Sequence, residues 1–174
     1  WFKVYKNTVK ESTYVKTEEL FNNHILPAIG EYVLAQIKPY HLQDAVDDWH
    51  QRLSKYKVIY NYMKRVFKYA LLQEYIKANP TDKVIVPTKK IERETYQREK
   101  DFYSKHELEH LMHLLSEHEA LKWYAVFRLL AYSGIRRGEV LALTWDDIDF
   151  KTNVLDINKT LAQGENNSII VQSP

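Results

Sequence analysis

The chain has 174 residues, enough for one large or two small domains, and 45% of them are hydrophobic, as in a folded protein. Its 25 basic and 23 acidic side chains leave a net charge of +2, and the lack of cysteine excludes disulfides and cysteine-bound zinc. No apolar run approaches the ~20 residues of a membrane span, so we expect no membrane partner. The lack of cysteine fits a reducing cytosol, and we expect a cytoplasmic protein.

The first predicted domain covers residues 1–87 and carries 13 basic against 9 acidic side chains, whereas residues 104–174 carry 7 against 10. We therefore expect a phosphate-binding surface within residues 1–87. A partial helix comes first. A second helix is capped by Ser12-Thr13 and closed by Pro27 and Gly30. Residues 41–54 and 57–76 have helical apolar periodicity, which completes a small four-helix bundle.

The last of these helices has a polar stripe opposite its apolar band. Lys57, Asn61, Lys64 and Lys68 follow one another at offsets of four, three and four residues, with Tyr60 on the flank. Such a surface suits backbone phosphates, because lysines displace condensed counterions and Asn and Tyr add hydrogen bonds. A solvated outer helix face explains the same pattern.

Residues 88–101 are rich in charge and poor in apolar side chains, and they predict an exposed linker. Lys89, Lys90, Arg93 and Arg98 could touch phosphates there, and an ordinary hinge explains them equally well.

The second predicted domain, residues 102–174, opens with a sequence that also fits a zinc-protease motif. His106 to His110 read H-E-x-x-H, which would make a zinc hydrolase one alternative. Ser104 and Glu107, however, form a capping box at the start of an amphipathic helix, and no third ligand motif follows. We therefore expect no metal site and no cofactor.

Residues 121–131 predict a helix that is buried on most sides. Near the end of the chain, residues 148–150, 154–157 and 168–171 predict three short strands, with a polar turn at 163–167, in one small antiparallel sheet.

Between the helix and the strands lies the most informative stretch, residues 132–150. Ser133-Gly134 breaks the apolar helix, since glycine tolerates the positive φ of a C-cap. Arg136 then lies on a tight turn before a second short helix, and Glu139 follows three residues later on the same helical face.

This stretch resembles the first catalytic box of the tyrosine recombinase (phage-type integrase) family, in which a small residue, Gly, an apolar residue and Arg precede x-x-Glu and a Leu-x-Trp-x-Asp-Ile-Asp tail. The positions that fit are Ser133, Gly134, Ile135, Arg136, Glu139, Leu141, Leu143, Trp145, Asp147, Ile148 and Asp149. The resemblance implies that Arg136 is a catalytic residue that holds a phosphate, with Glu139 orienting the site behind it.

Residues 1–87 resemble the core-binding (SAM-like) domain of the same family through Ser12-Thr13-Tyr14, Ile25 to Gly30, Phe67 to Ala70 and Asn79-Pro80. The resemblance implies a mainly α protein: a four-helix core-binding bundle, then a partial α+β catalytic domain with a small antiparallel sheet. It also implies double-stranded DNA as partner, a homotetramer on DNA, and DNA contacts from Thr13, Lys16, Lys55, Lys57, Tyr60, Asn61, Lys64 and Lys68.

The family also uses a hairpin lysine, a His-x-x-Arg box and a late tyrosine nucleophile, and these are not found in the chain. The hairpin lysine would be expected just after Pro174, and Lys159 lies at the wrong strand position for it. The chain begins with Trp1 and ends without a helix, which indicates a fragment. We therefore expect a piece of a site-specific DNA recombinase of a mobile element, which binds DNA but cannot cleave it alone. The alternative is a non-catalytic DNA-binding regulator with a recombinase-like front end.

Overall fold

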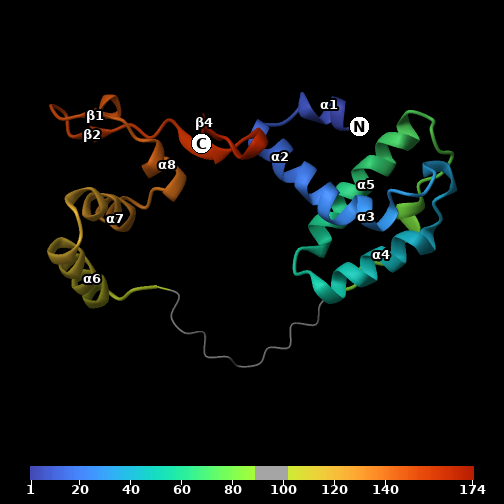
Figure 1. Cartoon of the computed structure of the whole chain (residues 1–174), viewed down its shortest axis with the longest axis horizontal. Coiled ribbons are helices and arrows are strands. Elements are labelled where there is room, and N and C mark those ends of the chain that lie inside the picture. Colours follow the sequence, from blue (N-terminus) through green and yellow to red (C-terminus); the bar gives the residue numbers. More distant parts are fainter. Residues whose placement is uncertain (89–101) are drawn as a thin grey trace. The chain divides into compact units, whose positions relative to one another are not determined.

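The computed structural model describes residues 1–88 and 102–174 of the chain. The chain divides into two compact units, Trp1–Glu92 and Arg93–Pro174, and the division falls inside the segment predicted as a linker. Apart from Thr88, that segment lies outside the described residues. The prediction that its four basic residues, Lys89, Lys90, Arg93 and Arg98, could touch phosphates falls there as well. The first unit is helical, and the second combines helices with two hairpins (Figure 1).

The helices of the first unit follow the predicted order. Its elements are α1 (Phe2–Lys6), α2 (Glu11–Leu20), a π turn (Phe21–Ile25), α3 (Leu26–Ile29), a 3₁₀ turn (Leu34–Gln36), α4 (Pro39–Arg52), α5 (Tyr56–Leu72) and a second 3₁₀ turn (Pro80–Lys83). Since α2, the π turn and α3 are consecutive, the α-helices of the first unit, within its described residues, fall into four segments, and the predicted bundle is confirmed. The predicted cap was wrong: Lys10 is the N-cap of α2, and Ser12 is buried within it.

Pro27 does not close the second helix, as had been predicted, because the chain continues in helical conformation to Ile29. A proline ring clashes with the carbonyl four residues earlier, here that of Asn23, in a regular α-helix. The wider π turn comes just before Pro27 and relieves this conflict. Gly30 then forms the C-cap.

The core of the first unit lies mainly between α4 and α5, whose apolar stripes were predicted from periodicity. Its most buried side chains from these helices are Leu42, Val46, Trp49, Ile59, Met63 and Phe67. Burying one side chain of this size contributes roughly 1.5–3 kcal/mol. The orientation of α5 is thereby fixed, with its opposite face toward solvent.

The helix α5 ends earlier than predicted, at Leu72 rather than Ile76. Glu74 adopts a left-handed conformation with φ of 58°. Its N–H donates to the carbonyl of Leu71 at 3.1 Å, and the next N–H donates to the carbonyl of Ala70 at 2.9 Å. This is a Schellman motif with glutamate at the position that glycine usually occupies. Ile76 follows outside the helix and is buried.

The second unit contains α6 (Lys105–His118), α7 (Leu121–Ser133), α8 (Arg137–Ala142), a 3₁₀ turn (Trp145–Asp147), β1 (Ile148–Asp149), β2 (Val154–Leu155), β3 (Thr160–Gln163), another 3₁₀ turn (Glu165–Asn167) and β4 (Ile169–Gln172). The predicted capping box of α6 is confirmed: the Ser104 N–H donates to the Glu107 carboxylate at 2.7 Å, and the Glu107 N–H donates to Ser104 Oγ at 3.3 Å.

The strands form two separate antiparallel pairs, so the single three-stranded sheet was wrong. β1 pairs with β2, and β3 pairs with β4 with Leu161 opposite Val171. The strand β3 was missed because Thr160–Gln163 contains little apolar signal, and its end had been assigned to a polar turn.

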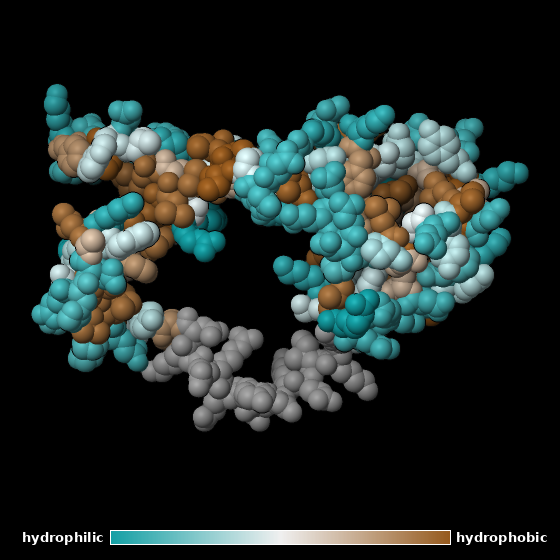
Figure 2. Space-filling view, viewed as in Figure 1, coloured by the Kyte–Doolittle hydropathy of each residue, from teal (hydrophilic) through white to brown (hydrophobic). Residues whose placement is uncertain are grey.

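The predicted burial of α7 was also wrong, because no residue of this helix is buried within the described chain. Trp123 and Phe127 are 46% and 43% exposed. Large apolar side chains are visible at the surface of the second unit in Figure 2. Apolar periodicity identifies an apolar face, but it does not say what that face contacts.

Candidate functional site

The corner between α7 and α8 has the backbone geometry that the sequence predicted. Gly134, the C-cap of α7, has φ of 69°, in the left-handed region that side chains other than glycine rarely adopt. The chain then leaves α7 and enters α8 with Arg136 as its N-cap residue. The arginine is therefore held on a short connection between two helices.

The Glu139 carboxylate accepts two hydrogen bonds from Arg136 across the first turn of α8. The Arg136 backbone N–H donates to Glu139 Oε2 at 2.7 Å, and its Nη1 donates to Oε1 at 3.1 Å. The Glu139 side chain is only 8% exposed, whereas that of Arg136 is 84% exposed. The carboxylate is thus the anchored partner, and the guanidinium is open to solvent.

The pKa of the Glu139 carboxyl is lowered, chiefly by the hydrogen bond from the Arg136 backbone N–H and further by the guanidinium, against the opposing effect of desolvation. The carboxylate therefore stays ionised at neutral pH. An arginine has five N–H donors in a planar fork, which matches two oxygens of one phosphate. The exposed side of Arg136 is suited to hold a phosphate in this way.

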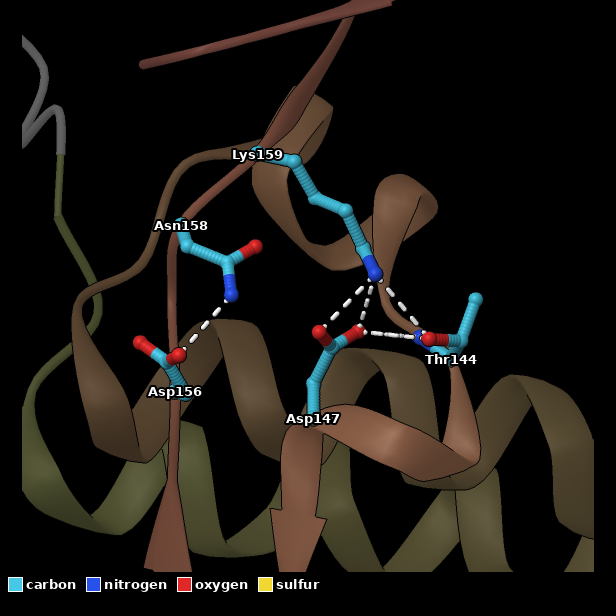
Figure 3. A network of polar contacts seen from close by, with 5 residues as sticks. All are labelled: Thr144, Asp147, Asp156, Asn158 and Lys159. Atoms are coloured by element: carbon cyan, nitrogen blue, oxygen red, sulfur yellow. Dashed lines mark hydrogen bonds and ion pairs between the residues drawn. The ribbon is translucent and has the colours of Figure 1, made fainter.

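A second polar network lies at the other end of α8. The carboxylate of Asp147 accepts from Lys159 Nζ at 2.7 and 2.8 Å and from the Thr144 N–H at 2.7 Å. The hydrogen bond from Lys159 is the main cause that lowers the pKa of Asp147 to about 2, and those from Thr144 add to it. Lys159, whose position does not match the hairpin lysine of the family, is thus held in an ion pair within the second unit (Figure 3).

The stripe of Lys57, Asn61, Lys64 and Lys68 is exposed along α5, as predicted. Lys55, the N-cap residue of α5, is exposed as well. The structure therefore presents these five side chains to solvent, and their contact with DNA remains a prediction.

Tyr60 was predicted on the flank of this stripe, and that placement was wrong. Its side chain is 7% exposed and packs in the core. Its hydroxyl donates to the carbonyl of Thr81 at 3.0 Å, and burial raises its pKa. In a helix, Tyr60 is one residue past Ile59 and three before Met63, which places it at the edge of the apolar band.

Two of the other predicted contacts come from α2. Lys16 is exposed, whereas Thr13 is half-buried, and its carbonyl accepts a bond from Thr17 Oγ1 at 2.7 Å. Lys16 and Lys55, far apart in the sequence, line the same hollow of about 300 Å³. The fold therefore brings the α2 and α5 parts of the predicted surface together.

Asn23 and His24 line the same hollow and were not among the predicted contacts. They lie seven and eight residues after Lys16, about two helical turns, so the helical period could have placed them on its face.

The histidines of the H-E-x-x-H sequence, His106 and His110, are both exposed on α6. Within residues 1–88 and 102–174, no group of three or more potential metal ligands lies close enough to hold an ion. Over the same residues, no helix combines the length and apolar character needed to cross a membrane.

Comparison with protein families gives two matches. The family described as "Phage integrase, N-terminal SAM-like domain" matches residues 1–50, and "Phage integrase family" matches residues 101–171. The second match includes the α7–α8 corner with Arg136 and Glu139.

Among curated relatives, a "Tyrosine recombinase XerC-like" protein of Caldanaerobacter subterraneus subsp. tengcongensis is 32% identical over 171 residues, which are 93% of this chain and 42% of that protein. The "Prophage ps2 probable integrase" of Lactococcus lactis subsp. lactis is 25% identical over 164 residues, 92% of this chain and 43% of the relative. The chain thus spans less than half the length of these relatives.

Among solved structures, the Tn1549 transposon integrase in complex with transposon right end DNA aligns with a TM-score of 0.73 at 20% identity, covering 98% of this chain and 54% of that one. A lambda integrase tetramer bound to a Holliday junction aligns with a TM-score of 0.67 at 12% identity, covering 99% and 48%. These likenesses concern the fold. The two family matches and the relative that is 32% identical show that the chain belongs to the tyrosine recombinase (phage integrase) family.

Proposed function

We propose that this chain is the DNA-binding and phosphate-holding front part of a site-specific DNA recombinase, the integrase of a mobile element. The observation that carries the proposal is the α7–α8 corner, where an anchored Glu139 fixes the backbone of an exposed Arg136. An exposed guanidinium on a fixed backbone is what a phosphoryl-transfer site requires of its arginine.

In the proposed reaction, a tyrosine hydroxyl attacks a DNA phosphate. The tyrosine hydroxyl gives up its proton as its oxygen forms a bond to phosphorus. The bond to the 5′ oxygen breaks, and that oxygen takes up a proton and leaves as a hydroxyl. The product is a 3′-phosphotyrosyl intermediate. Negative charge builds up on the non-bridging oxygens during the attack, and Arg136 stabilises it by pairing with both of them.

The chain contains neither a His-x-x-Arg sequence nor a tyrosine in the context of the family's nucleophile. The curated relatives are more than twice as long as the aligned part. We therefore assign the nucleophile and the remaining catalytic groups to a longer protein, and we expect the 174-residue chain to bind DNA without cleaving it.

We assign the DNA contacts to the exposed side chains of the first unit. They are Lys16 on α2, Lys55 before α5, and Lys57, Asn61, Lys64 and Lys68 on α5, with Thr13 at the edge of this surface. Each lysine that neutralises a phosphate releases counterions and strengthens binding without regard to base sequence.

By analogy with the lambda integrase tetramer on a Holliday junction, we propose that the complete protein acts as a homotetramer on DNA. Because the curated relatives are bacterial proteins and the proposed substrate is cellular DNA, we propose a cytoplasmic location.

The test combines two measurements on the same samples. Fluorescence anisotropy of a labelled duplex should show binding that weakens steeply as salt is added. A denaturing gel should then show free DNA and no covalent protein–DNA adduct. Absence of binding at low salt would contradict the DNA-binding assignment, and an adduct would show that the chain carries its own nucleophile.

A further inference from the structure

The ammonium group of Lys159 is held at one end of α8. Its Nζ lies 2.7 Å from Asp147 Oδ2, 2.8 Å from Oδ1 and 3.0 Å from Thr144 Oγ1 (Figure 3). The side chains of Lys159 and Asp147 are 25% and 5% exposed. Both charges are therefore largely removed from water, where an ion pair must be well formed to persist.

Asp147 is also the structural centre of the turn that follows α8. Its Oδ2 accepts from the backbone N–H of Thr144 at 2.7 Å and from Thr144 Oγ1 at 2.8 Å. Its carbonyl accepts from the N–H of Asp156 at 2.9 Å. Lys159 thus joins the segment before β3 to the turn that directly follows α8.

The two residues after Lys159 contact the opposite end of the same helix. A Cβ added to Gly138 would lie 2.5 Å from Thr160 Oγ1 and 2.9 Å from the carbonyl oxygen of Leu161. The backbone at the start of β3 therefore packs directly against the first turn of α8. Residues 159–161 therefore contact both the first turn of α8 and the turn that follows this six-residue helix.

We propose that Lys159 is a positioning residue for Arg136: its ion pair with Asp147 keeps α8 seated on β3 and thereby fixes the turn from which the arginine projects. The inference rests on the proposed function only in taking Arg136 as the phosphate-binding group. If α8 loses its attachment at one end, it can rotate about the Gly138 contact, and the backbone of Arg136 moves relative to Glu139.

A direct catalytic role fits Lys159 less well. Three oxygens of Asp147 and Thr144 surround its ammonium group. A lysine that donates a proton to a leaving oxygen would first have to break this ion pair, at the cost of leaving a mostly buried carboxylate unpaired.

The test uses the 174-residue chain and a variant that keeps the net charge, Asp147→Asn with Lys159→Met. Carbon-detected NMR would follow the Glu139 carboxyl through a pH titration. Because the two charges are removed together, a purely long-range electrostatic effect on Glu139 is small. We call the ion pair of Lys159 with Asp147 the brace. If the brace positions α8, its loss should raise the Glu139 pKa toward its ordinary value and shift the Arg136 guanidinium resonances.

The control is Glu119→Gln with Lys122→Met, which makes the same change of charge on exposed residues of the second unit outside the brace. It should leave the Glu139 titration and the Arg136 resonances unchanged. Unchanged Glu139 and Arg136 signals in the folded brace variant would overturn the proposal. If that variant does not fold, Asp147→Asn alone takes its place, since it removes the ion pair and keeps the shape of the side chain, and the positive charge that it adds would by itself lower the Glu139 pKa. A rise in the Glu139 pKa supports the brace, and no change overturns it.

A second readout uses DNA. Arg136→Ala should weaken duplex binding by a smaller factor in the brace variant than in the wild type, because a displaced arginine contributes less. An equal factor in both backgrounds contradicts the brace. If the wild-type chain binds no DNA, the proposed function fails, and the NMR titration still decides the role of Lys159.

Discussion

Replacing Lys64 and Lys68 by alanine should change how DNA binding responds to salt. Both side chains are exposed on α5, one helical turn apart, on the face opposite the core. Each lysine that neutralises a phosphate contributes about 0.9 to the slope of log affinity against log salt, so the double variant should lower the slope by about 1.8. Between 50 and 200 mM salt, the affinity advantage of the wild type should then shrink roughly tenfold.

Fluorescence anisotropy at four or five salt concentrations would measure both slopes. The matched control is Lys77→Ala with Lys83→Ala, which removes the same charge from exposed lysines of the first unit that lie outside the stripe. Its slope should stay close to that of the wild type. If both double variants lose the same amount of slope, only the total charge matters. If the variant without Lys64 and Lys68 keeps the slope of the wild type, the placement of DNA along α5 is refuted.

Three further predictions concern stability. Glu74→Gly should stabilise the first unit against urea by up to about 1 kcal/mol, since glycine adopts the left-handed conformation of that Schellman position without strain. Gly138→Ala should destabilise the second unit by about 1–3 kcal/mol, because the new methyl group meets Thr160 Oγ1 and the carbonyl of Leu161. Adding Thr160→Ala should restore only part of this stability, and hydrogen exchange would measure both changes. The pKa of Asp147 in the fold, about 2, is below its ordinary value of about 3.9, so its stabilising effect should be complete above about pH 4 and disappear as the pH falls to about 2. Acid unfolding of Asp147→Asn, followed by circular dichroism, should lack this part of the pH dependence, and an identical profile would contradict the ion pair.

Local signals in the sequence were sufficient for much of the fold and for the α7–α8 corner. Periodic apolar residues located α4 and α5, and Ser104 with Glu107 located the start of α6. Gly134 and the three-residue spacing of Arg136 and Glu139 depend on backbone conformation and helical period, both of which are local.

Features that depend on tertiary contacts could not be obtained in this way. Tyr60 is polar at its tip and apolar in its ring, and its burial depends on the carbonyl of Thr81, which is 21 residues away in the chain. The ion pair of Asp147 with Lys159 joins two segments of which only the first belongs to the family motif. The hollow that unites Lys16 with Lys55 exists only because α2 packs beside the start of α5.

At the α7–α8 corner, the hydrogen bond that keeps the turn in shape is made by the backbone of residue 136, and its side chain is not needed for that bond. One oxygen of the Glu139 carboxylate holds the Arg136 backbone N–H, a group that every residue except proline supplies. The corner can therefore keep its shape when the side chain at position 136 is lost. In the proposed assembly on DNA, a subunit that lacks the Arg136 side chain should therefore still fold and take its place without supplying the phosphate-binding group, whereas loss of the Glu139 carboxylate should disturb the corner itself.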